Sequence, residues 1–198
     1  MVDNNIQEKR MENYFIDSGY NILLEKGIDK LTVRNIAKKA GYSYATIYNY
    51  FNNSDELMWA IGLKVLENLA QLLHQHYEEI KNSVDNRKLI KSVYREYIDY
   101  FLENESLYHF IFLKNINVVA IRKDEQNHPP ILYNLQQEIM ENFVKKGIIK
   151  REEAIIAGDL LTNSINGLLS LYFSGKENIS KKNLYQKANQ YIDYIISG

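Results

Sequence analysis

The sequence predicts an all-α protein: an N-terminal three-helix domain followed by a C-terminal helical bundle, with about nine helices in total. Apolar residues recur along most of the 198 residues at the three- and four-residue spacing of helix faces. The chain has only two prolines, adjacent at Pro129 and Pro130, so few residues interrupt helices. Alternating apolar and polar runs, which are typical of strands, are hard to find.

The composition is that of a soluble globular protein, with 45% apolar and 25% charged residues. Cysteine is absent, which excludes disulfides and thiolate metal sites. The first ten residues lack the apolar stretch of a signal peptide, and we find no uncharged apolar run of about 18 residues. We therefore expect a cytoplasmic protein without a membrane partner.

The first three helices are each marked by local signals. Residues 5–26 form the first, with an apolar face and a stop at Gly27. Thr32 is the expected N-cap of the second helix, which ends at Gly41. Ser43 is the expected cap of the third, in which Ile47 and Phe51 face the core because they lie four residues apart. Asn52 and Asn53 end the third helix.

Six further helices follow from apolar periodicity. They are expected at about 54–81, 87–103, 106–112, 131–146, 151–174 and 180–196, with a polar loop at 122–130. The helix at 151–174 is apolar nearly all round, so it is expected to be buried, in part between subunits.

The segment from Thr32 to Phe51 reads as two helices joined by a tight turn, which is the pattern of a helix-turn-helix. The window from Lys30 to Ser54 contains four basic residues and no acidic one. The whole chain has a formal net charge of −1, so positive charge is concentrated locally rather than spread. A local basic face is sufficient for contacts with DNA phosphates.

The same segment resembles the TetR family of bacterial transcriptional regulators. The resemblance covers about residues 8–66 and rests on matches at fixed spacing: Thr32, Ile36, Ala37, Ala40, Gly41, Ser43, Tyr48, Tyr50 and Phe51. Three positions depart from the family pattern: Tyr42 in the turn, Ala45 in the third helix, and Ser54, where a lysine that holds a backbone phosphate is frequent.

The resemblance implies a DNA-binding domain at 1–53 that uses Thr32, Tyr42, Ser43, Tyr44, Ala45, Thr46, Tyr48, Tyr50 and Ser54. Residues 44 to 46, in the first turn of the third helix, are placed to reach base edges in the major groove. Tyr48 and Tyr50 are expected to point away from the core face formed by Ile47 and Phe51 and to donate to phosphates.

The resemblance also implies a ligand-binding and dimerisation domain at 54–198. Helices 151–174 and 180–196 of two subunits would pair in a homodimer. The expected lining of a pocket for a small apolar or aromatic effector is Tyr97, Phe101, Tyr108, His109, Phe112, Phe143 and Asn166.

The sequence thus predicts a repressor that binds a double-stranded DNA operator and is released by an effector. Control by a protein partner is the alternative. We expect neither a cofactor nor an enzyme, because no catalytic constellation is visible. A metal site is not expected, because His74 and His76 lie two residues apart and face different directions on their helix.

Overall fold

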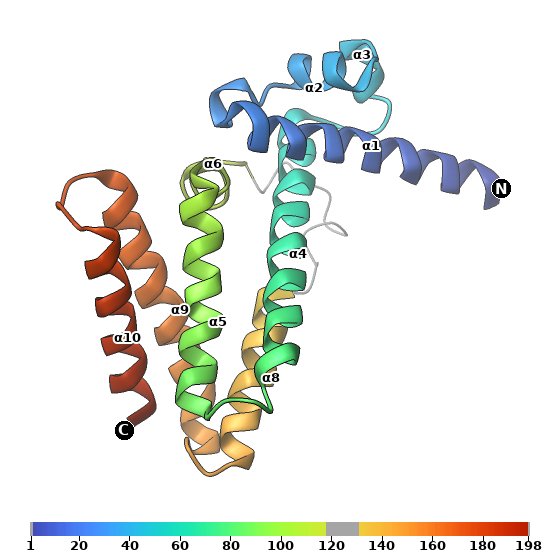
Figure 1. The fold of residues 1–198 in the computed structure, drawn as a ribbon. Helices are drawn as coiled ribbons and strands as arrows, with labels where there is room; N and C mark the ends of the chain where they lie inside the picture. Colours follow the sequence, from blue (N-terminus) through green and yellow to red (C-terminus); the bar gives the residue numbers. More distant parts are fainter. Residues whose placement is uncertain (1, 118–130, 198) are drawn as a thin grey trace. The chain divides into compact units, whose positions relative to one another are not determined.

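The computed structural model describes residues 2–117 and 131–197, and Figure 1 shows their arrangement in helices. These ranges contain nine α-helices, one 3-10 helix (η1) and one π-helix (η2), and no strand. The all-α prediction is therefore confirmed. The elements in chain order are α1 (Val2–Lys26), η1 (Ile28–Lys30), α2 (Val33–Ala40), α3 (Tyr44–Ile47), α4 (Ser54–Ile80), α5 (Asn86–Glu103), α6 (Glu105–Tyr108), η2 (His109–Leu113), α8 (Ile131–Lys145), α9 (Arg151–Ser174) and α10 (Lys181–Ser197). The loop predicted at 122–130 lies outside the described residues.

Two predicted helices differ in detail. The third is α-helical only over Tyr44–Ile47 and continues in turns, in which the Tyr48, Asn49 and Tyr50 amides donate to carbonyls three residues back. Asparagine and tyrosine are weak helix formers, so this end of the helix tightens. The helix predicted at 106–112 is the short α6 followed by η2, so its second half is wound more widely than predicted.

The described residues divide into two compact units. Unit 1 comprises the residues up to Asn68 together with 104–117, and unit 2 comprises Leu69–Glu103 together with 131–197. This division differs from the boundary expected after residue 53, because the first part of α4 and all of α6 and η2 pack with the N-terminal helices. Helix α4 itself contributes residues to both units.

Unit 1 is built around a core drawn from its α-helices and from η2. Its fully buried side chains include Phe15, Ile22, Leu23, Ile36, Ile47, Leu57, Ile61, Tyr108 and Phe110. Gly19 allows α1 to approach α4 closely, since a Cβ at that position would lie 2.3 Å from Ile61 Cδ1. The predicted inward residues of the helix-turn-helix, Ile47 and Phe51, are buried.

Unit 2 is a helical bundle in which α9 packs against α8 and α10, and α5 packs against α10 (Figure 1). Gly158 leaves room on α9 for Gln136 of α8, since a Cβ there would lie 2.5 Å from Gln136 Nε2. Among the described helices, α9 alone is long and apolar enough to cross a membrane by length and composition, and 39% of its most apolar window is buried within the chain.

Two glycines of unit 1 are expected to respond oppositely to alanine. Gly41 has φ +76°, so Gly41→Ala introduces left-handed strain and should lower the free energy of unfolding by about 1–2 kcal/mol. Gly62 lies inside α4, where a Cβ would meet Ile111 Cδ1 at a comfortable 3.7 Å. Gly62→Ala should therefore raise stability by roughly 0.5–1 kcal/mol. Urea unfolding of the full chain measures the change in the free energy of unfolding for each variant. Changes of the same sign in the two variants would contradict the assigned backbone roles.

Candidate nucleic-acid interface and ligand cavity

Helix α2 begins at a side-chain cap on the surface. Thr32 is exposed and extended, and its hydroxyl accepts a hydrogen bond from the Asn35 amide at 3.2 Å. The Asn35 side chain donates to the Lys30 carbonyl at 2.8 Å, which fixes the chain on the other side of the cap. The start of α2 is thereby held in one conformation, with its remaining amides free to face an anion.

The turn between α2 and α3 is a Schellman motif. The Gly41 amide donates to the Lys38 carbonyl at 3.2 Å, and the Tyr42 amide donates to the Ala37 carbonyl at 3.0 Å. Gly41 supplies the left-handed residue that this motif requires. The predicted turn residue thus has the predicted role, and it sets the direction in which α3 starts.

Tyr42 is half exposed, but its ring packs onto α1. The ring lies edge-on to those of Tyr14 and Phe15, at centroid distances of 6.3 and 5.6 Å, and the hydroxyl donates to Met11 Sδ at 3.7 Å. Tyr42 therefore joins the turn to α1 in addition to presenting one edge to solvent.

Helix α3 begins at Ser43, whose hydroxyl accepts from the Thr46 amide at 3.1 Å and lies 2.8 Å from the Thr46 hydroxyl. Thr46 is half-buried, whereas Tyr44 and Ala45 are exposed. The first turn of α3 therefore presents Tyr44 and Ala45 fully to solvent, and Thr46 only in part.

Tyr44 and Tyr48 form a pair on the outer face of this segment. Their hydroxyl oxygens lie 2.8 Å apart and their ring centroids 5.1 Å apart in an edge-on arrangement. The hydrogen bond with Tyr44 is the main cause of a Tyr48 pKa raised above its usual value of 10.0, with partial burial adding to the shift. The raised pKa keeps the Tyr48 phenol protonated at neutral pH, and because one hydroxyl of the pair donates to the other, the pair has one proton left to donate to an anion.

The remaining predicted DNA-binding residues flank this pair. Tyr50 is half-buried, with its ring centroid 5.7 Å from that of Phe15, so it also belongs to the packing of unit 1. Ser54 is exposed at the first position of α4. All nine predicted residues lie in unit 1, and seven of them are exposed: Thr32, Tyr42, Ser43, Tyr44, Ala45, Tyr48 and Ser54.

The cations near this surface are not equivalent. Lys39 contacts both carboxylate oxygens of Glu25 at 2.8 Å, and this pairing holds the pKa of Glu25 below its usual value of 4.5. Arg34 and Lys38 are exposed. Lys39 therefore links α2 to α1 through a surface ion pair.

Unit 2 contains a cavity of about 230 Å³, partly open to solvent, between α4, α5, α8 and α9. Its walls are mostly apolar and aromatic. The lining residues are Leu73, Val93, Tyr94, Tyr97, Leu132, Tyr133, Leu135, Gln136, Ile139, Met140, Asp159, Thr162 and Asn163.

A chain of hydrogen bonds follows one wall of the cavity. Thr162 donates its hydroxyl proton to Gln136 Oε1 at 2.7 Å, so the Tyr94 hydroxyl, 3.0 Å away, donates to Thr162. The Gln136 amide in turn donates to Asp159 Oδ1 at 3.2 Å. Burial raises the Tyr94 pKa to about 12, which keeps its proton in place. The chain thus runs from a phenol to a carboxylate and leaves Asp159 as the final acceptor.

Only Tyr97 of the seven predicted pocket residues lines this cavity, and its hydroxyl donates to Asn166 Oδ1 at 2.6 Å. Phe101 and Phe143 are fully buried in unit 2, away from the cavity wall. Tyr108, His109 and Phe112 belong to unit 1, where the Tyr108 and Phe112 rings lie 4.8 Å apart. Sequence reasoning missed the contribution of α8, whose side chains at 132, 135, 136, 139 and 140 carry no signal beyond helical periodicity.

Helices α9 and α10 expose several large apolar side chains. On α9 the exposed positions Ile156, Leu160, Gly167 and Leu171 share one face. On α10, Tyr194 is 84% exposed. A surface groove of about 780 Å³ is lined by Ile156, Ala157, Leu160, Tyr194 and Ile195, with Glu152, Glu153 and Asp193 at its edges.

Comparison with known proteins agrees with this geometry. Residues 15–61 match the tetR family of bacterial regulatory proteins. Over 186 residues, 92% of each chain, the sequence is 22% identical to a fatty acid metabolism regulator protein of Bacillus subtilis.

Two solved structures share the fold. RolR in complex with resorcinol matches with a TM-score of 0.74 and 16% identity, over 96% of this chain and 89% of that one. FadR of Bacillus subtilis in complex with stearoyl-CoA matches with a TM-score of 0.65 and 21% identity, over 93% and 97% of the two chains. The family match over residues 15–61, the similarity to the Bacillus subtilis regulator along most of the chain and the shared fold together support a regulator of the tetR type.

Proposed function

We propose that the protein is a homodimeric repressor that leaves its DNA operator when a small aromatic ligand fills the cavity of unit 2. The cavity itself is the observation that carries the proposal: apolar walls with a few convergent polar groups are typical of small-molecule sites. A filled core between α5 and α9 would instead favour control by a protein partner, so the cavity counts against that alternative.

The size of the cavity limits the ligand. Its volume is about 230 Å³. This space suits a molecule with one aromatic ring, such as the resorcinol bound by RolR. The stearoyl-CoA bound by FadR has a long acyl chain and a nucleotide, and it far exceeds this space.

The polar wall limits the ligand chemically. The hydroxyl protons of Tyr94 and Thr162 and one amide proton of Gln136 are directed toward Asp159, whose carboxylate is left as an acceptor for a ligand. A ligand with hydroxyl or amine donors satisfies this acceptor, whereas an anionic ligand would lie beside the Asp159 carboxylate and be disfavoured.

On the DNA side, α3 enters the major groove with Tyr44, Ala45 and Thr46 toward base edges. Tyr48 and the capped start of α2 at Thr32 contact phosphates, with Ser54 at the start of α4 as a further phosphate contact. Helix α4 runs from Ser54 to the cavity wall at Leu73. A ligand that moves α4 therefore changes the position in which α3 meets DNA. Coupling of about 1–3 kcal/mol would weaken operator binding by roughly 5- to 150-fold.

The dimer forms through the exposed apolar face of α9 and α10. A large exposed apolar surface on a protein of this composition marks an interaction site. Gly167 has no neighbour within 4 Å of an added Cβ in its own chain, which leaves space for close approach by the same helix of a second copy. Two-fold symmetry then presents two recognition helices to a palindromic operator.

Tyr48→Phe is expected to weaken binding to all DNA sequences by about tenfold, because it removes one hydroxyl that donates to a charged phosphate. Thr46→Ala and Tyr44→Ala should in addition relax base preference. Selection of bound DNA from a random pool, followed by affinity measurement on the selected sites, separates the two effects. A Tyr48→Phe protein with unchanged affinity and altered preference would contradict these roles.

Ile139→Phe is expected to fill the cavity and abolish ligand-induced release while leaving operator affinity in the absence of ligand unchanged. Ile139→Leu conserves volume and serves as the matched control. The measurement is release of labelled operator DNA by single-ring phenols and amines, with thermal unfolding to verify that Ile139→Phe is folded. Full release from the filled variant would refute the proposed location of the ligand.

Leu160→Glu is expected to convert the dimer into a monomer, because it places charge in the apolar face of α9, where Leu160 is 50% exposed. Leu72→Glu, at a 37% exposed position of α4, is the control and should leave the dimer intact. Sedimentation velocity distinguishes the two species. A wild-type monomer, or a dimeric Leu160→Glu protein, would exclude this interface.

A further inference from the structure

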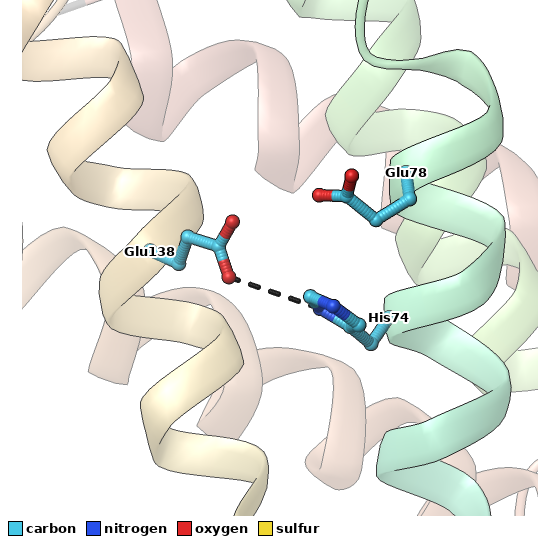
Figure 2. Close-up of side chains that lie close together, drawn as sticks. All are labelled: His74, Glu78 and Glu138. Atoms are coloured by element: carbon cyan, nitrogen blue, oxygen red, sulfur yellow. Dashed lines mark ion pairs between the residues drawn. The ribbon is translucent and has the colours of Figure 1, made fainter.

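Three potential metal ligands converge on the surface of unit 2. His74 and Glu78 lie one turn apart on α4, and Glu138 reaches toward them from α8 (Figure 2). Their ligand atoms all lie within 4.8 Å of one another, and His74 Nδ1 is 3.8 Å from Glu138 Oε2. All three side chains are exposed, so small rotamer changes can close the remaining distance.

We propose that His74, Glu78 and Glu138 bind a divalent transition-metal ion, with Zn²⁺, Co²⁺ and Ni²⁺ as the matching class. One imidazole nitrogen and two carboxylate oxygens form a donor set that these ions accept, and solvent completes the coordination at an exposed site. The imidazole disfavours Mg²⁺ and Ca²⁺, which select oxygen ligands. The spacing of four residues between His74 and Glu78 places two ligands on one face of α4, as helical metal motifs do.

The electrostatics of the cluster favour a cation. The negatively charged carboxylates of Glu78 and Glu138 lie close together. Lys81 is the cation paired with Glu78. The hydrogen bond to Glu78 is the main cause of a Lys81 pKa raised above 10.5, and the charge of Glu138 adds to the shift. The Tyr77 pKa is raised first by burial and then by Glu138. A metal ion that binds here therefore competes with Lys81 for Glu78.

In the sequence, the neighbouring His76 gives no indication that His74 pairs with a residue of α8. The His76 ring lies 2.8 Å from the Ser92 hydroxyl, on a different side of α4. The third ligand comes instead from residue 138, which only the packing of the bundle brings into reach. A bound ion would join α4 to α8, so metal binding should raise the thermal stability of the folded chain by mass action.

The test uses the full-length protein without a histidine tag, after treatment with a chelator. Zn²⁺ binding is measured by calorimetry, Co²⁺ binding by visible absorption, and stability by thermal unfolding with and without Zn²⁺. We expect one ion per chain and a rise in unfolding temperature. His74→Ala and Glu138→Gln should each weaken Zn²⁺ binding by at least about tenfold. Mutation of a residue that only hydrogen-bonds to a metal ligand already lowers metal affinity by about that factor.

Two further variants sharpen the result. Lys81→Ala should strengthen Zn²⁺ binding, because it removes the cation that competes for Glu78. His109→Gln is the matched control: His109 forms a similar pair with Glu105, four residues earlier and 3.6 Å away, outside the three-residue cluster. It should leave Zn²⁺ affinity unchanged.

The proposal is overturned if the wild-type protein takes up no Co²⁺ or Zn²⁺, or if His74→Ala and Glu138→Gln bind as tightly as wild type. Loss of binding in His109→Gln alone would equally exclude the assigned site. The measurements involve neither DNA nor the effector, so their outcome is independent of the proposed repressor function.

Discussion

Both candidate sites depend on the way α4 is buried along its length. Its buried side chains recur every four residues, at Leu57, Ile61, Val65, Leu69, Leu73 and Tyr77. An α-helix turns about 100° per residue, so a four-residue step advances the buried line by about 40° and makes it wind around the helix. A winding line meets different neighbours along its course, which allows one helix to serve the core of unit 1 and the cavity wall of unit 2.

The helix-turn-helix was predictable because local chemistry specifies it. Thr32 and Ser43 cap the helices, Gly41 adopts the left-handed turn, and each acts within five residues of its own position. Ile47 and Phe51 were identified by spacing alone. The cavity was not predictable in the same way, because four helices from distant parts of the sequence create it. Aromatic residues such as Phe101 and Phe143 have the composition of a pocket lining but fill the core instead.

The relatives illustrate why the fold does not identify the ligand. RolR and FadR share this architecture, yet one is complexed with resorcinol and the other with stearoyl-CoA. The volume of the cavity and the direction of its hydrogen bonds carry that information instead. In this protein, the series of hydrogen bonds from Tyr94 to Asp159 distinguishes the cavity chemically from a purely apolar one.

In the proposed complex with DNA, the contact between Tyr44 and Tyr48 lowers the entropic cost of binding. Each ring restricts the other, and their hydroxyls are joined before DNA arrives. Ordering a free side chain at an interface costs about 0.5–1.5 kcal/mol, and two tyrosines that are already ordered avoid much of this cost. Binding through two rings that are already ordered therefore requires little change in the shape of the free protein.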